Sequence, residues 1–387
     1  MSNSALWLRG FRPFFLGASL FAIVTMATWL GLYRFGLQLP LDGVSMFQWH
    51  AHEMIYGYSL AVIAGFLLTA AWNWTGEKTA SGAGLAWVFA PWVIARALMA
   101  GGTHYLVYAA LADLAFLLAA GFAVSRPIIK VRQKRQIPVL LILFLLMLAN
   151  GAFYLGAAGL LESGVRLGIH GGLYIVLGMV LFMGRRVIPF FTQRGVGYEV
   201  ELKNARWNDI TTYILYPLFL VTEVWFPQSH AGALLAGALL FSNSIRVNGW
   251  HTLGIWQKPL LWGLFAAFIM INLGFLLRAM ASFTALPDYL PVHAFAVGGI
   301  GILTISMMAR VTLGHTGRNV HQAPQIMTVL LTCMVLTTTV RVFAPLVDPR
   351  NYQLWITVSG ALWIVSFILF SIVFIPMLVG QRVDSKP

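Results

Sequence analysis

The chain has 387 residues, of which 59% are hydrophobic and only 10% are charged, and its mean hydropathy is +0.80. This composition excludes an ordinary soluble protein, because apolar runs of about 20 residues, long enough to cross a bilayer, recur along the chain. A net charge of +13 would suit nucleic acid, but the basic residues gather in loops on one side of the predicted membrane. We therefore expect a lipid bilayer, and no nucleic acid, around the chain.

In chain order, the apolar runs predict an all-α polytopic integral membrane protein with about twelve transmembrane helices. The expected spans are 13–34, 49–72, 83–101, 104–125, 137–160, 166–188, 209–226, 230–246, 260–281, 291–313, 324–344 and 352–379. No segment between them is large enough for a soluble domain, so residues 1–387 are expected to form a single transmembrane helical domain. The third and fourth spans, and the seventh and eighth, lie so close together that their boundaries are the least defined.

The loops predict the orientation of the chain. Most of its 25 Lys and Arg residues fall in segments on the same side as the two termini. Cytoplasmic loops of membrane proteins carry such an excess of basic residues. We therefore expect a multi-pass protein whose termini are both cytoplasmic.

Histidines form a layer on the opposite, outer side. Six of the nine histidines begin predicted spans there, namely His50, His52, His104, His170, His230 and His293. Imidazole is costly inside a bilayer and is the commonest metal ligand in proteins. We therefore predict that His50, His52, His170 and His293 hold haem and a metal, with satisfied core histidines as the alternative. His104 and His230 are at short outer turns and are expected to be interfacial.

The start of the second span carries the strongest chemical pattern. In an α-helix, His50, Glu53 and Gly57 share one face and His52 lies nearly opposite. One metal can take both imidazoles only if the helix begins after His50; otherwise they serve two centres, or one of them anchors a haem propionate. Glu53 is a candidate to orient a ligating imidazole or to relay protons. Glu223, near the outer end of the seventh span, is the second candidate proton relay.

His315 belongs to a different region from the outer histidines. It lies 22 residues beyond His293 in the same predicted span, roughly 33 Å away, so the two cannot share a centre in an unbroken helix. We expect it on the inner side near Arg185 and Arg186, and these three residues are candidates for binding a cofactor. The single cysteine, Cys333, excludes a four-thiolate iron–sulfur cluster and covalent c-type haem, so any haem is held non-covalently, and we expect haem b.

Arg96 in the third predicted span and Asp113 in the fourth are charged residues within the membrane. An unpaired charge is expensive in the bilayer, so the two are expected to form an ion pair. Joining the two helices is the expected role, and proton transfer or propionate binding is the alternative.

The sequence also contains a weak internal repeat. Without a gap, His52 aligns with His293, Gly57 with Gly298, and Thr75-Gly76 with Thr316-Gly317. His170 begins the sixth span in a similar way, and Thr192 follows 22 residues later. Because membrane proteins often contain repeats, an architecture of three four-helix units is possible.

Several of these segments together resemble the NnrS family. The matching segments are Phe11–Phe15, Trp49–Glu53, Ala64–Ala70, Asn73–Gly76, Gly184–Thr192, His293-Ala294 and Leu313–Arg318. The resemblance implies a twelve-helix protein of the bacterial inner membrane that contains haem and copper and is linked to nitric oxide metabolism and nitrosative stress. Histidines on the second, sixth and tenth spans also look like those of haem–copper oxidases and nitric oxide reductases. This chain lacks their adjacent histidine pair on the seventh span and their double-histidine motif on the tenth.

Three functions follow as hypotheses. In the first, the protein binds nitric oxide at haem and copper and reduces it as an oxidoreductase, with electrons from an external donor and protons through Glu53 or Glu223. In the second, it is a transporter for metal or another small solute, which twelve helices and buried charges also suit. In the third, it is a non-catalytic nitric oxide sensor or protects cellular iron.

Overall fold

The structure is a computed structural model that describes residues 5–41 and 43–384, and within these residues every regular element is a helix. The long helices follow the predicted spans in order, which confirms the all-α prediction. They include α1 (Phe11–Arg34), α4 (Ala83–Ala100), α5 (Leu106–Lys130), α6 (Ile137–Ala157), α7 (Gly164–Gly195), α8 (Arg206–Trp225), α9 (His230–Trp250), α10 (Pro259–Ala281), α13 (Ile326–Val347) and α14 (Tyr352–Val379). Short 3-10 turns lie at Ala5–Trp7, Thr103–Tyr105, Lys134–Gln136, Leu253–Gln257 and Pro349–Asn351.

The second and tenth predicted spans are composite rods rather than plain α-helices. Each rod has an α-helical start, a π-helical middle and an α-helical end. They are α2 (Met46–His52), η2 (Glu53–Ser59) and α3 (Leu60–Thr75), and α11 (Tyr289–His293), η6 (Ala294–Gly301) and α12 (Ile302–His315). In both rods the π-helix begins directly after the histidine that the repeat aligns, so the repeat extends to the backbone conformation.

Among the described residues, ten helical segments are long and apolar enough to cross a membrane. They correspond to every predicted span except the seventh and eighth, which form helices α8 and α9. Polar residues explain the difference, because α8 contains Asp209 and Glu223, and α9 contains Asn243, Arg246 and Asn248. The chain is therefore a multi-pass membrane protein, and α8 and α9 are less apolar than its ten candidate spans require.

Local sequence signals fix the ends of the composite rods. Ser45 accepts a hydrogen bond from the amide of Gln48 at 3.2 Å, and the Gln48 side chain accepts one from the Ser45 amide at 2.8 Å. This capping box starts α2. Gly76 ends α3 with a φ of +72°, and Gly317 follows α12 with a φ of +77°. Left-handed backbone favours glycine, so the Thr-Gly pairs of the repeat have the same role at both exits.

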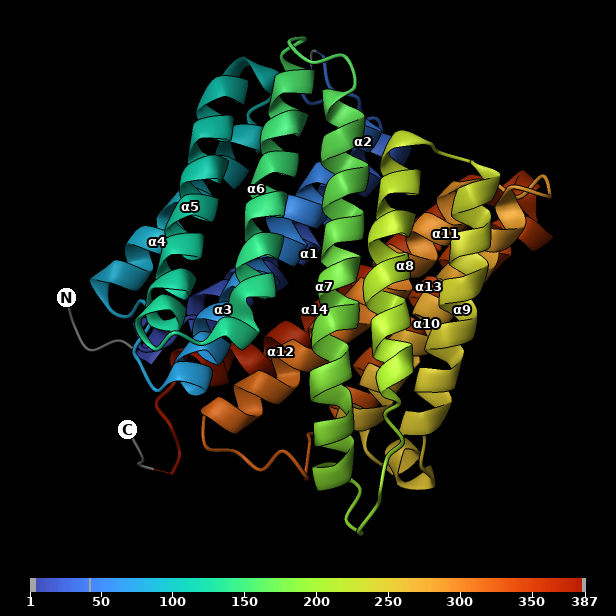
Figure 1. Ribbon diagram of the computed structural model, residues 1–387. Helices are drawn as coiled ribbons and strands as arrows, with labels where there is room; N and C mark the ends of the chain where they lie inside the picture. The colour runs from blue at the N-terminus through green and yellow to red at the C-terminus, as the bar shows by residue number, and fades with distance from the viewer. Residues whose placement is uncertain (1–4, 42, 385–387) are drawn as a thin grey trace. The chain divides into compact units, whose positions relative to one another are not determined.

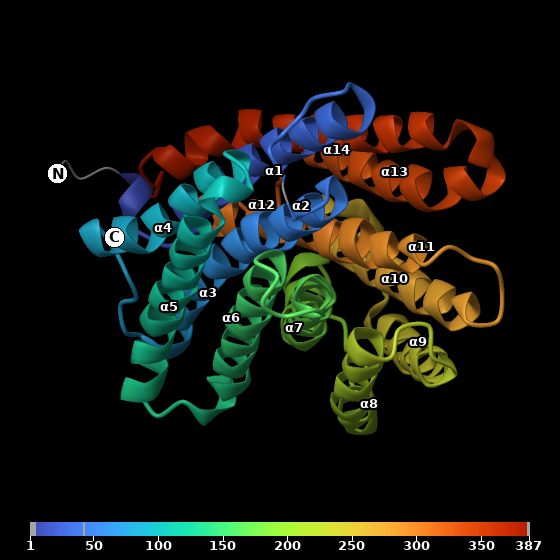
Figure 2. The ribbon, with the colours of Figure 1, turned by 90° about the horizontal axis from the view of Figure 1, so that it is seen from above.

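The chain packs as two compact units. The first contains residues 1–176, 308–318 and 367–387, and the second contains residues 177–307 and 319–366. In the first unit α4, α5 and α6 pack side by side, and in the second α8, α9 and α10 do so (Figures 1 and 2). Each unit holds one π-helix, whereas α7, which carries His170, is α-helical from Gly164 to Gly195.

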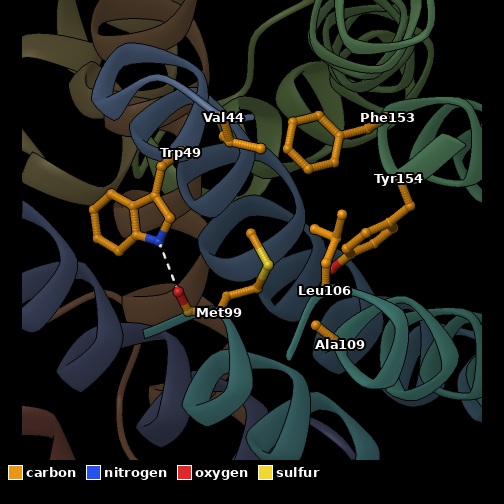
Figure 3. Packing of buried hydrophobic residues seen from close by; sticks show 7 residues of the cluster. All are labelled: Val44, Trp49, Met99, Leu106, Ala109, Phe153 and Tyr154. Atoms are coloured by element: carbon orange, nitrogen blue, oxygen red, sulfur yellow. Dashed lines mark hydrogen bonds between the residues drawn. The ribbon is translucent and has the colours of Figure 1, made fainter. Parts of the chain in front are cut away.

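An apolar cluster in the first unit surrounds the start of the second span (Figure 3). Its buried members are Val44, Trp49, Met99, Leu106, Ala109, Phe153 and Tyr154. The indole nitrogen of Trp49 donates to the carbonyl of Met99 at 3.2 Å, so its polar atom is satisfied within the cluster. This cluster fixes the helix that presents His52 and Glu53.

Candidate functional site

A buried group of four ionisable side chains lies in the first unit, and we call it the charged cluster: His52, Glu53, Arg96 and Asp113. Their side chains are between 0% and 6% exposed. Arg96 donates from Nη1 to Glu53 at 2.6 Å and from Nη2 to Asp113. The predicted Arg96–Asp113 pair is therefore confirmed, and Glu53 is a second partner of the same guanidinium. The negative charges of the two carboxylates lie against the guanidinium and the imidazole, whereas an isolated buried charge would be costly.

Both ring nitrogens of His52 have side-chain partners inside the charged cluster. Nδ1 lies 2.8 Å from Glu53 Oε1, and Nε2 lies 3.0 Å from Asn150 Oδ1. The ring also stacks on Phe153, with centroids 4.1 Å apart. Tyr154 donates to Asp113 at 2.7 Å, so α6 closes the cluster with an amide and a phenol. Both ring nitrogens of His52 are therefore in contact with protein side chains, whereas a metal ligand needs a ring nitrogen for the metal.

The π-helix brings the backbone close to the charged cluster. A Cβ atom at Gly57 would lie 2.4 Å from the Phe21 ring and 3.1 Å from Arg96 Nη1. The carbonyl of Gly57 accepts a hydrogen bond from the Trp92 indole at 2.9 Å. Only glycine permits this approach. π-helical turns are frequent at functional sites, and this one lies directly against the buried charges.

His50 has different surroundings from His52. Its ring stacks on Trp29, with centroids 4.4 Å apart and planes 20° apart. Helical spacing predicted that Glu53 shares the face of His50, but Glu53 contacts His52 instead. The Glu53 carboxylate turns toward Nδ1 of His52 and Nη1 of Arg96. His50 and His52 therefore serve separate groups of residues.

His170 and His293 each form the same kind of hydrogen bond, between Nδ1 and a backbone carbonyl, which is common behind metal-ligating imidazoles. Nδ1 of His170 lies 3.3 Å from the carbonyl of Arg166, and Nδ1 of His293 lies 2.7 Å from that of Tyr289. In both cases the acceptor is the carbonyl four residues earlier in the chain. A carbonyl can only accept, so Nδ1 is the donor in each of these hydrogen bonds. Ligating histidines almost always have such a partner for their second nitrogen.

The inner candidates have protein partners of their own. His315 accepts at Nδ1 from Arg9 at 3.0 Å, and its Nε2 lies 3.4 Å from Asn73 Nδ2. Arg185 forms an ion pair with Asp209 at 2.6 Å, and Arg186 lies over the Phe182 ring at 4.2 Å. His315 is in the first unit and the two arginines are in the second.

Glu223 is also in a buried ion pair. Arg278 donates from Nε to the two carboxylate oxygens of Glu223 at 2.7 and 2.8 Å, and their side chains are 7% and 4% exposed. A Cβ atom at Gly232 would lie within 3 Å of both groups, so α9 packs its backbone against the pair. Both candidate proton relays, Glu53 and Glu223, are thus bound to an arginine. Each of these carboxylates is therefore held by a guanidinium inside the protein.

The candidate ligands, His170 and His293, fit a haem better than a copper site with several protein ligands. Among the residues that the structure describes, no three His, Cys, Asp or Glu side chains come together in a way that could hold a metal ion. Haem b needs only one or two imidazoles with the tautomer that His170 and His293 have. A copper centre with three protein ligands does not fit this part of the chain.

Sequence reasoning missed the polar partners of the known charges. Asn150 and Tyr154 lie four residues apart on α6, which places them on one face. An amide within an otherwise apolar span was the available signal, because buried polar groups need partners in the bilayer.

Comparison with known proteins gives one match that covers nearly the whole chain. The family described as NnrS protein matches residues 5–382. A search of the curated proteins found no match.

Proposed function

Because the chain belongs to the NnrS family, a membrane family connected with nitric oxide, we propose that it binds haem b and, through it, nitric oxide. We further propose that it resides in the bacterial inner membrane with both termini in the cytoplasm, as the basic loops predict. Its partners would then be nitric oxide and the lipid bilayer.

The observation that supports this proposal most strongly is the hydrogen bond from Nδ1 of His293 to the Tyr289 carbonyl, repeated at His170 and Arg166. It holds the imidazole in one tautomer and one orientation and makes Nε2 more basic. We propose these two histidines as the residues that would hold haem. When bound, the haem iron would supply a coordination position for the gas.

The charged cluster has a supporting part in this proposal. His52 orients no metal of its own, and it joins α2 to α6 through Asn150 and to Arg96 through Glu53. Its ion pairs hold the helices of the first unit in a fixed arrangement. Glu53 and Glu223 are each paired with an arginine, and binding of nitric oxide, unlike its reduction, needs no proton from either of them. An external electron donor is needed only for reduction.

Copper stays part of the proposal as a second metal without assigned ligands. The described residues provide no group of three ligands for it, so no step is derived from it. Metal analysis of the purified protein measures copper directly, and a copper content below one atom in ten chains would remove it from the proposal.

One experiment tests haem binding and separates it from transport. The full chain is purified in detergent, its absorption spectrum is recorded, and the acid-extracted cofactor is identified by mass spectrometry. We expect a Soret band of stoichiometric intensity, intact haem b, and a shift of the band when nitric oxide is added. A chain without a Soret band that moves metal or another small solute into liposomes would be a transporter instead.

A further inference from the structure

Three arginines from distant parts of the sequence lie at the same end of the first unit, and we call them the basic inner cluster: Arg9, Arg318 and Arg382. All three side chains are partly exposed. The positive charge of Arg382 repels that of Arg9, and all three charges repel that of a fourth arginine, Arg12. The cluster is independent of the histidines proposed to hold haem, so it calls for its own explanation.

Arg9 is held in place by two contacts. Its guanidinium lies over the Trp72 ring at 4.5 Å, and it donates to Nδ1 of His315 at 3.0 Å. Burial and the nearby charge of Arg382 lower the pKa of Arg9. The side chain is therefore fixed close to another cation, at a cost that an anion would offset.

Arg12 is buried next to the basic inner cluster and adds a fourth positive charge to this region. It is 2% exposed, and it donates to the carbonyls of Leu378 and Gly380, both at 2.7 Å. These carbonyls are at the C-terminal end of α14, where the helix dipole favours a cation. Arg12 is thus satisfied by the protein, and the three partly exposed arginines are the ones that a ligand could reach.

A single carboxylate is described next to these charges. Asp384 accepts from Arg382 at 2.7 and 2.6 Å, and the amide of Val383 donates to the Thr316 carbonyl at 3.1 Å. A Cβ atom at Gly317 would lie 2.5 Å from Asp384 Oδ1, so the C-terminal segment packs closely on the turn after α12. Four arginines against one aspartate leave a strong positive excess.

The ends of the helices define the depth of the cluster. α3 ends at Thr75, α12 at His315 and α14 at Val379, and all three belong to membrane-spanning segments. Trp72 lies beside Arg9, and Lys78 approaches the same ring at 6.0 Å. Tryptophan beside basic residues is typical of the headgroup layer of a bilayer. The positive excess therefore lies at the level of lipid phosphates.

We propose that Arg9, Arg318 and Arg382 bind the phosphate of an anionic phospholipid at the inner face of the membrane. Guanidinium groups suit phosphate because they offer several donors in a planar arrangement. Basic pockets on the cytoplasmic side of membrane proteins bind anionic headgroups by the same chemistry. His315 acts as a positioning residue, because it accepts from Arg9 and fixes its orientation.

Native mass spectrometry tests this proposal on the full chain, purified and stripped of lipid in detergent. Phosphatidylglycerol, phosphatidylcholine and inorganic phosphate are added separately to the native protein and to R318Q/R382Q. The matched control is R132Q/R135Q, which removes two charges from another basic loop. R318Q alone is the second variant, because Arg318 has only a 3.5 Å contact with the Thr316 carbonyl to lose.

We expect phosphatidylglycerol to bind the native protein and the control equally, and to bind about fivefold more weakly for each arginine removed from the cluster. Equal weakening in R132Q/R135Q would mean that only general charge matters and would overturn the proposal. Equal binding of phosphatidylcholine would also overturn it. If inorganic phosphate bound as tightly and displaced the lipid, the ligand would be a soluble phosphate rather than a lipid headgroup.

Discussion

His52 and His293 occupy equivalent positions in two α–π–α rods, yet their imidazoles have different partners. Glu53 follows His52 and lies 2.8 Å from its Nδ1, whereas Ala294 follows His293 and Nδ1 bonds to the Tyr289 carbonyl at 2.7 Å. Side chains contact both nitrogens of His52, whereas Nδ1 of His293 contacts a backbone carbonyl. The same backbone conformation thus places the two histidines against different kinds of partner.

The largest effect should come from the charges around His52. Arg96→Ala leaves Glu53 and Asp113 buried without their common partner. Breaking a buried pair in this way costs about 3–5 kcal/mol. We expect a loss of that size in the free energy of unfolding, measured by thermal or denaturant unfolding in detergent.

Two further variants sharpen this prediction. Asp113→Ala should cost less than Arg96→Ala, because Arg96 keeps Glu53. The double variant should cost less than Arg96→Ala alone, since Asp113 is then no longer stranded. Strictly additive losses would show that Arg96 and Asp113 do not interact.

Haem retention should separate the two histidines. Removal of a hydrogen-bond partner behind a metal ligand weakens binding about 10–100-fold, so loss of the ligand itself in His293→Ala should exceed a hundredfold. His52→Gln should keep its haem and unfold at a lower temperature. The Soret absorbance per chain and the melting temperature measure both outcomes. Loss of haem from His52→Gln at an unchanged melting temperature would reverse the two assignments.

The π-helices should tolerate no added methyl group. A Cβ atom would lie 2.4 Å from Phe21 at Gly57 and 2.6 Å from Met270 at Gly298. Overpacking of this kind costs about 1–3 kcal/mol, so both Gly→Ala variants should unfold more easily. Gly151→Ala is the matched control, because α6 offers open space there, and it should be neutral or stabilising. Equal stability of all three variants would show that the rods do not need glycine.

The smallest effect on haem is expected from His315. Its Nδ1 accepts from Arg9, so His315→Ala should leave the iron–histidine stretch in the resonance Raman spectrum unchanged. The same variant should weaken binding of phosphatidylglycerol by misplacing Arg9. Loss of the stretch in both His293→Ala and His315→Ala would place His315 at the haem instead.

The helices could be predicted well because their signal is strong and local. Every predicted span has a helix, since a bilayer demands long apolar runs whose backbone is fully hydrogen-bonded. The Arg96–Asp113 pair was predictable for a similar reason, because a charge inside the membrane requires a partner. Most pairs of residues far apart in sequence carry no charge that requires a partner, so the sequence does not predict them.

The π-helices and the surroundings of His52 could not be predicted. A π-turn has no composition of its own, and the direction of the Glu53 carboxylate depends on its side-chain rotamer, which sequence spacing does not determine. Asn150 carries no charge, so nothing in the sequence links it to His52. The hydrogen bonds of His170 and His293 depend on rotamers, which sequence spacing does not determine.

The clamp between Arg12 and the end of α14 links the first helix to the last. Its donor and acceptors are separated by 366 and 368 positions in the chain, so the ribosome makes the guanidinium long before its carbonyl partners. Until α14 is inserted, Arg12 lacks these partners. A chain cut short before Leu378 would leave a cation unsatisfied in a buried position. The stability of α1 therefore depends on the synthesis of residues 378–380. We expect chains that lack these residues to be degraded faster than chains that contain them.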